Sequence, residues 1–264
     1  MTAQYDDEIN LRDYINVLIK RKVTIFVAFF ICVAAVAFYS FTAPEIYRVE
    51  ETIRIGQVDG SLISKAEAIR LIRSKNTLQP VVEALDKDLS LSGLKKSLKI
   101  EEVKGTDFLS ISINHKNPQR AIEILKNTAD NFIKYGNSLY AKKIKLLEER
   151  MEALEIQKQS IKKEINSLQG VIKDKVTPDY PLIQNTLTSY EAIYSQLDDK
   201  IYALKVKLTN AKKFELFEPP LEPKSPISPK KKQNIAIAGI LGLMLGVFIA
   251  FFREFWVNSA GEEE

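Results

Sequence analysis

The sequence is poor in the residues that build most catalytic and metal centres. It contains one cysteine, Cys32, and one histidine, His115, in 264 residues. One cysteine excludes an intramolecular disulfide, and one histidine excludes a histidine-rich metal site. The sequence also lacks a phosphate-binding P-loop and the motifs G-x-G-x-x-G, H-E-x-x-H and C-x-x-C. We therefore expect no catalytic residue, no metal and no cofactor, and we interpret the chain as a protein other than an enzyme.

Charge of one sign does not predominate either. The 38 lysines and arginines are nearly balanced by 34 aspartates and glutamates, and the net charge is +4. A nucleic-acid-binding surface needs basic residues gathered on one face, so we expect no nucleic acid partner. Adjacent acidic pairs such as Glu50-Glu51 could supply general acids and bases, but nothing in the sequence ties them to a pocket. They are interpreted as solvated surface.

The first of two long apolar runs covers residues 23–41 and contains no charged residue. As a helix it would be roughly 28 Å long, close to the hydrocarbon thickness of a bilayer. Three basic residues, 20–22, precede it, which predicts that residues 1–22 lie in the cytoplasm. A cleaved signal peptide is the alternative, because residues 35–37 resemble a cleavage site. The run continues beyond that site, so we interpret it as an uncleaved transmembrane anchor.

The second apolar run predicts a transmembrane helix at residues 234–252. Arg253 and Trp256 follow as interfacial anchors, and residues 253–264 then form a cytoplasmic C-terminus. Lysines 230–232 come just before this span and lie outside, against the positive-inside tendency. Long translocated loops tolerate such charge, and the first helix usually sets the topology.

Three glycines share one face of the second predicted span: Gly239, Gly242 and Gly246. Gly242 and Gly246 form a GxxxG pair, which lets two membrane helices approach closely. The alternative is that glycine is simply common in membrane helices. We interpret the three glycines as a packing face.

Residues 42–233 are polar enough to lie in water and are predicted to form one periplasmic domain. Its base, residues 42–117 and 213–233, alternates β-branched strand patterns with short amphipathic helices. The predicted strands cover residues 46–55, 98–103 and 108–113, and the predicted helices cover residues 61–74 and 77–85. The base is therefore expected to be a small α/β layer.

A helical arm is predicted for residues 118–212. Apolar residues recur there at alternating spacings of four and three, which is typical of a coiled-coil seam, with one polar interruption at Lys158. The seam residues of the first helix include Ile144, Leu147, Met151, Leu154, Ile161, Ile165 and Leu168. Pro178 and Pro181 end this helix, and a second seam follows from Ile183 to Leu208. The two stripes predict an antiparallel hairpin, and each needs a partner helix or a neighbouring subunit. The alternative is an ordinary amphipathic core.

Prolines recur at every third position just before the second span: Pro220, Pro223, Pro226 and Pro229. In a polyproline II helix this spacing puts all four on one face. The segment is interpreted as a stiff membrane-proximal strut, which is either a spacer or a surface for packing.

These features predict an α+β membrane protein in which two transmembrane helices flank a periplasmic α/β base domain with a long coiled-coil-like helical hairpin. Their order resembles the chain-length determinant family, the Wzz-type polysaccharide co-polymerases. INLRDYINVLIKRKVTI before the first span is similar to the opening of that family. FLSISINHKNPQRAIEILKNTADNF is similar to its strand, Asn/Asp-Pro and helix, with Asn117, Pro118, Ala121 and Asn127. The prolines before a glycine-containing second span are the most specific match.

The resemblance implies a regulator of surface polysaccharide chain length, such as lipopolysaccharide O-antigen, with no catalytic activity of its own. Such a protein forms a homo-oligomeric ring in the bacterial inner membrane. Its implied partners are a separate polysaccharide polymerase, the growing glycan chain and membrane lipid.

Two alternatives share this architecture. One is a membrane adaptor that activates a polysaccharide tyrosine kinase; residues 253–264 are short for docking an enzyme and contain no tyrosine. The other is a capsule-export component with a periplasmic arm. A sensory receptor is less favoured, because no output domain follows the second span.

Overall fold

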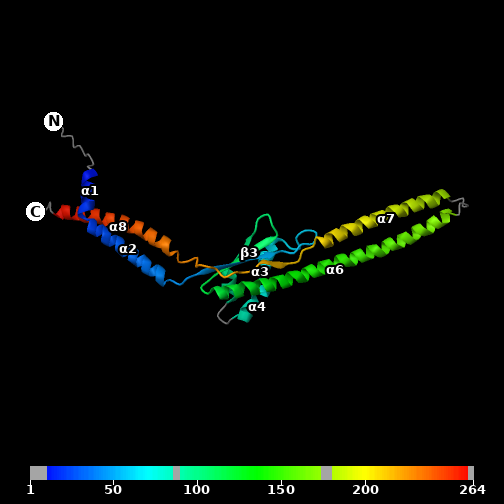
Figure 1. Cartoon of the computed structure of the whole chain (residues 1–264), viewed down its shortest axis with the longest axis horizontal. Helices are drawn as coiled ribbons and strands as arrows, with labels where there is room; N and C mark the ends of the chain where they lie inside the picture. Colours follow the sequence, from blue (N-terminus) through cyan, green and yellow to red (C-terminus); the bar gives the residue numbers. More distant parts are fainter. Residues whose placement is uncertain (1–10, 86–89, 174–179, 261–264) are drawn as a thin grey trace, which may run out of the picture. The chain divides into compact units, whose positions relative to one another are not determined.

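The computed structural model describes residues 11–85, 90–173 and 180–260 (Figure 1). The chain forms two compact units. The first combines the two ends of the chain, Met1–Tyr47 and Pro223–Glu264, and the second contains Arg48–Glu222. The prolines at 223, 226 and 229 therefore group with the apolar helices rather than with the base.

Three helices make up the described part of the first unit: α1 (Leu11–Lys20), α2 (Lys22–Thr42) and α8 (Lys231–Ala260). α2 and α8 lie side by side (Figure 1). Both are long and apolar enough to cross a membrane, with mean hydropathies of 2.4 over Lys22–Thr42 and 2.7 over Lys231–Val257. The two predicted spans thus correspond to two helices, whereas the short amphipathic α1 was not predicted.

The second unit is built around a four-stranded sheet with the strand order β2-β3-β1-β4. β2 pairs antiparallel with β3, and β1 pairs antiparallel with β4. The strands are β1 (Tyr47–Arg54), β2 (Leu98–Glu102), β3 (Phe108–His115) and β4 (Glu215–Glu218). The first three lie where strands were predicted. β4 was missed because it has only four residues and is followed directly by prolines.

One face of the sheet carries the hydrophobic core. α3 (Lys65–Ile72), α4 (Lys75–Leu85), α5 (Leu91–Ser97) and the start of α6 (Pro118–Lys173) supply its helical side. The predicted helices correspond to α3 and α4, and α5 was not predicted. The largest fully buried side chains are Phe132, Phe214, Ile53, Ile55, Ile72, Leu78, Leu94, Leu98, Leu109, Ile111, Ile124 and Leu125.

α6 runs unbroken for 56 residues and pairs with α7 (Tyr180–Thr209). Figure 1 shows the two helices side by side, with α6 extending further to pack on the sheet. Pro181 is the second residue of α7, where a missing backbone N–H costs nothing. Pro178 lies outside the described residues. The fold class predicted from the sequence, two apolar helices with an α+β base and a helical hairpin, is confirmed.

Candidate functional site at the helix pair, the proline segment and the arm

The glycine face of α8 contacts α2 most closely at two of its three positions. A Cβ at position 246 would lie 2.9 Å from both Cα and O of Ile25, and one at 242 would lie 3.0 Å from Cys32 Cβ. A Cβ at 239 would meet only the ring of Phe29, at 3.4 Å. Gly242 and Gly246 therefore bring the two helices together, whereas Gly239 leaves room for a methyl group.

This difference predicts a matched pair of outcomes. Gly246→Ala should push α8 away from α2, because the new methyl group meets backbone, and should destabilise the helix pair by about 1–3 kcal/mol. Gly239→Ala should change stability by less than about 0.5 kcal/mol. Thermal unfolding of the full-length protein in detergent micelles measures both. Equal midpoints for the two variants would show that the glycine face does not limit helix approach.

Ion pairs join α8 to the junction of α1 and α2. Glu254 of α8 accepts hydrogen bonds from Lys20 Nζ at 2.5 Å and Arg21 Nε at 2.8 Å. Glu254 is only 6% exposed. These bonds fix the junction of α1 and α2 to the end of α8.

A second set of polar contacts lies where α2 ends and α8 begins. Ile46 N donates to Ser228 O at 2.9 Å, and Ile227 N donates to Ile46 O at 2.8 Å. Lys231 Nζ lies 2.9 Å from Glu45 Oε1. Hydrogen bonds from Lys231 and from the Tyr47 hydroxyl hold the pKa of Glu45 below its usual value. The segment before α8 is thus fixed to the segment after α2.

The four prolines of the predicted strut are all half-buried, whereas the residues between them at 221, 222, 224 and 225 are exposed. Pro220 belongs to the second unit, and Pro223, Pro226 and Pro229 belong to the first. The segment forms neither helix nor strand, apart from the bridge of Ser228 with Ile46. Pro229 also lines a groove of about 400 Å³ together with Tyr39 and Pro44. The prolines are thus less exposed than the residues between Pro220 and Pro226, whereas residues 227 and 228 are half-buried as well, and the single-face strut stays a prediction.

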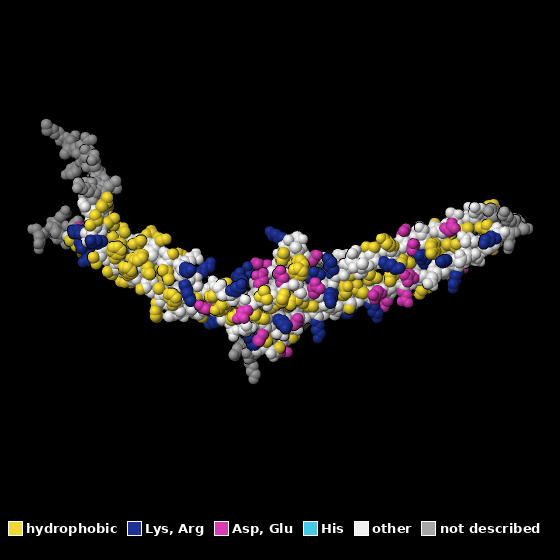
Figure 2. All heavy atoms as spheres, in the orientation of Figure 1, with side chains coloured by type: hydrophobic (Ala, Val, Ile, Leu, Met, Phe, Trp, Pro, Cys, Tyr) yellow, Lys and Arg dark blue, Asp and Glu magenta, His cyan; other side chains and the backbone are white. Residues whose placement is uncertain are grey.

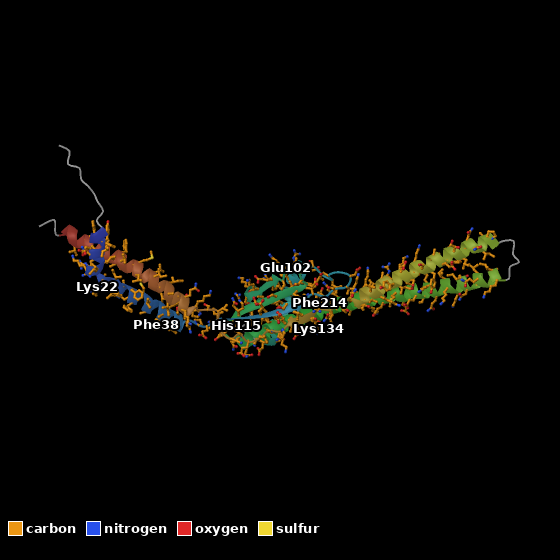
Figure 3. The ribbon with its side chains drawn as sticks, turned by 45° about the horizontal axis from the view of Figure 1, so that its top comes forward. Lys22, Phe38, Glu102, His115, Lys134 and Phe214 are labelled. Atoms are coloured by element: carbon orange, nitrogen blue, oxygen red, sulfur yellow. The ribbon has the colours of Figure 1, made fainter. Side chains whose placement is uncertain are left out.

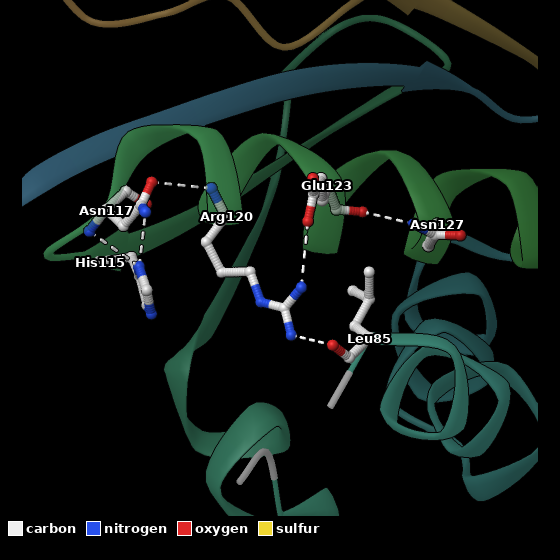
Figure 4. A network of polar contacts seen from close by, with 6 residues as sticks. All are labelled: Leu85, His115, Asn117, Arg120, Glu123 and Asn127. Atoms are coloured by element: carbon white, nitrogen blue, oxygen red, sulfur yellow. Dashed lines mark hydrogen bonds and ion pairs between the residues drawn. The ribbon is translucent and has the colours of Figure 1, made fainter. Parts of the chain in front are cut away.

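The Asn-Pro motif forms the N-terminal cap of α6 (Figure 4). Asn117 Oδ1 accepts from Arg120 N at 3.1 Å, and Asn117 N donates to His115 Nδ1 at 3.0 Å. Asn127 Nδ2 donates to Glu123 O at 2.8 Å. Ala121 is fully buried in the core. The single histidine therefore contributes to a helix cap. The described residues contain no group of three or more histidines, cysteines or acids that could hold a metal ion.

The ring of Phe214 fills a space bounded by Gly56 and Gly136, the glycine slot, which was not predicted. A Cβ at Gly136 would lie 2.5 Å from Phe214 Cγ, and a Cβ at Gly56 would lie 2.5 Å from Phe214 Cδ2. Asn137 binds the backbone of Phe214 on both sides, donating to its O at 3.1 Å and accepting from its N at 3.0 Å. Figure 3 marks Phe214 in the base. Gly136, a glycine inside the long predicted helix, was the sequence feature that could have indicated this slot.

Glu51 corrects one sequence interpretation. It is 1% exposed rather than solvated, and neither carboxylate oxygen has a hydrogen-bond partner among the described residues. Burial, and to a smaller extent the charge of Asp130, raises its pKa to about 8. Its neighbour Glu50 is exposed, as expected, and accepts a hydrogen bond from Ser110.

The seam residues of the arm lie between α6 and α7. Leu147 and Ile165 are buried, and Ile144, Met151, Leu154, Ile161 and Leu168 are half-buried. The polar seam residue Lys158 lies 4.7 Å above the ring centroid of Tyr194 and pairs with Asp198. The hydrogen bond that Lys158 donates to Asp198 raises the pKa of Lys158. The polar position in the seam therefore forms a charged contact between α6 and α7.

Two family models match the chain. Residues 7–98 match the Wzz model, described as "Chain length determinant protein". The chain carries a Wzz chain length determinant domain. This domain takes in α1, α2, β1 and the helices α3 to α5. The resemblance to chain length determinant proteins, predicted from the order of motifs, is thus confirmed for these residues. Residues 183–255, most of α7 and α8, match the GNVR model, described as "G-rich domain on putative tyrosine kinase".

Three of the solved structures to which the chain is similar are described as polysaccharide co-polymerases or chain-length regulators. A full-length bacterial polysaccharide co-polymerase is 18% identical, covers 96% of this chain and 99% of its own, and has a TM-score of 0.45. A mutant of the Shigella flexneri lipopolysaccharide O-antigen chain-length regulator WzzB is 15% identical over 69% of this chain and 100% of its own, with a TM-score of 0.24. A fragment of WzzB, the polysaccharide co-polymerase from Salmonella Typhimurium, is 18% identical over 70% and 100%, with a TM-score of 0.24. The assignment of the domain rests on the sequence model alone. No characterised protein matches the chain by sequence.

Proposed function

We propose that this protein regulates the chain length of a surface polysaccharide, lipopolysaccharide O-antigen or a related glycan. It acts without catalysis of its own, as an inner-membrane co-polymerase of a separate polymerase. The match of residues 7–98 to the chain length determinant model carries the proposal. The close-packed helix pair supports it, because α2 and α8 together provide a two-span anchor for the domain between them.

The proposed orientation puts both chain ends in the cytoplasm and residues 42–233 in the periplasm. The basic residues 20–22 before α2 support it, because lysine and arginine flanking the first span favour the cytoplasmic side. The arm and base are then on the side where surface glycan is polymerised.

Self-association is part of the proposal. Large apolar side chains remain exposed on the arm outside its seam, with Leu146 at 58%, Ile156 at 63% and Tyr202 at 70%. These side chains are available for contact with another chain. Neighbouring copies in a homo-oligomeric ring would cover these positions, and the growing glycan would be held or released by the assembly.

Deleting the gene tests the function directly. We expect the modal clustering of surface glycan lengths on gels to disappear, because polymerisation then ends at random, while total glycan is still made. Wild-type protein and the Gly239→Ala variant should both restore the clustering. A length distribution that is the same with and without the protein would contradict the proposal.

A second candidate is supported by the G-rich domain match at residues 183–255. The protein would then be the membrane adaptor that activates a polysaccharide tyrosine kinase. Co-purification of the full-length protein with a cytoplasmic ATPase, and loss of tyrosine phosphorylation on deletion, would favour this function. A capsule-export component would instead be identified by loss of export at unchanged glycan length.

A further inference from the structure

A groove of about 420 Å³ lies between α2 and α8, toward the end of the pair where α1 is attached. This volume is within the range of small-ligand sites. Its walls are apolar except at one end, where Thr24 and Arg253 lie. The other lining residues are Val23, Val27, Ala28, Ile31 and Cys32 of α2 and Leu245 and Ile249 of α8. An elongated apolar ligand with one polar end suits this lining.

The cations at this end are only partly neutralised. Residues 20–22 and 253 are all basic, and Glu254 is the adjacent acid. Glu254 binds Lys20 and Arg21. Lys22 and Arg253 are exposed and have no acidic partner in the described part of the chain. Figure 3 labels Lys22 at this end of α2, with Phe38 toward the other end. Arg253 therefore lies in the lining of the groove and Lys22 directly before its lining residue Val23, both without an acidic partner among the described residues.

Aromatic side chains mark the depth of these cations in a bilayer. Phe248, Phe252 and Trp256 follow one another along the exposed face of α8, with ring centroids 6.4 Å and 5.9 Å apart. Tryptophan at the end of a membrane helix lies at the level of the lipid head groups. Arg253 is three residues before Trp256 in α8, about 5 Å along the helix axis, and so lies near that level. Figure 2 shows the apolar surface of the helix pair ending in basic side chains.

We propose that this groove binds one anionic phospholipid, with an acyl chain along the apolar walls and its phosphate paired with Arg253 and Lys22. Guanidinium binds phosphate with two parallel hydrogen bonds, which favours Arg253 as the main head-group contact. The site rests on the membrane placement in the proposed function, but it does not depend on glycan length control. The bound lipid would hold the spacing of α2 and α8 where Gly246 has already brought them close.

Native mass spectrometry of the full-length protein tests the site with phosphatidylglycerol and phosphatidylcholine of identical acyl chains. We expect one phosphatidylglycerol to be retained per chain, at least fivefold more than phosphatidylcholine. Arg253→Gln should remove this preference, and Lys22→Gln should reduce it. Lys232→Gln is the matched control, because it removes the same charge at the opposite end of α8 and should leave the preference intact.

The only cysteine lines the groove and gives a second measurement without any substitution. Alkylation of Cys32 by N-ethylmaleimide should be slower in nanodiscs that contain phosphatidylglycerol than in discs of phosphatidylcholine alone. Equal retention of the two lipids by wild type would overturn the proposal. So would a Cys32 that is equally protected in both discs, because a helix of a second copy would then fill the groove. An unchanged glycan distribution on gene deletion would contradict the proposed function while leaving these lipid measurements unaffected.

Discussion

Replacing Phe214 by alanine is expected to destabilise the second unit by about 3–5 kcal/mol, the range for a fully buried aromatic residue. Phe214 is 0% exposed and packs edge to face on Phe132, with ring centroids 5.7 Å apart. The glycines on either side have no side chains that could move into the space. Denaturant unfolding of the full-length protein in detergent, followed by far-UV circular dichroism, measures the loss.

Phe217 provides the matched control three residues further along the chain. It is 47% exposed and stacks on Phe108 at 4.4 Å, so Phe217→Ala should cost only about 1 kcal/mol. A double-mutant cycle sharpens the test. Gly136→Ala should be strongly destabilising in wild type, but close to neutral when Phe214 is already alanine. Additive effects of the two substitutions would contradict the glycine slot.

Replacing Glu51 by methionine is expected to stabilise the protein, and to do so more strongly as the pH rises. The usual pKa of a glutamate, 4.5, applies in the unfolded chain, and burial raises it to about 8 in the folded one. Between these values the folded state holds a proton that the unfolded state has lost. Wild-type stability should therefore fall from about pH 4.5 to about pH 8 and stay level above it. The fall is on the order of 5 kcal/mol.

Glu51→Met removes both the titration and the two unsatisfied oxygens, so its stability should not show this decline. Glu50→Met is the control, because it changes the adjacent exposed residue and should stay within about 0.5 kcal/mol of wild type at each pH. Unfolding midpoints at pH 5, 6.5, 8 and 9 give the comparison. If wild type and Glu51→Met show the same pH dependence, Glu51 is ionised in the folded protein.

The sequence predicts the elements whose patterns are long and regular. The seam from Ile144 to Leu168 fixes one face of a helix over many turns, so local periodicity alone was enough to place the arm. The two uncharged runs identify α2 and α8 for the same reason. At the candidate site, the GxxxG spacing indicated which face of α8 contacts a helix. It could not indicate that Gly246 lies against backbone while Gly239 does not.

The features that were missed depend on residues far apart in the sequence. Phe214 is buried because Gly56 and Gly136 both lie beside it, and no local pattern connects these three positions. Glu51 is buried because Val49, Glu51 and Ile53 of β1 are two residues apart and so share the face of the strand that is turned to the core. Its polar side chain predicted an exposed position, but the two-residue period of the strand places it on the buried face. The domain division at residues 118 and 212 remains a prediction, since the first turns of α6 pack within the base core.

The glycine slot has a consequence for the order in which the chain assembles during synthesis. Gly56 and Gly136 leave the ribosome long before Phe214, which fills the space between them. Until that ring and β4 emerge, β1 has an unpaired edge and the core has a gap. The base therefore cannot be completed until the hairpin has been translated, before the final helix α8 has emerged.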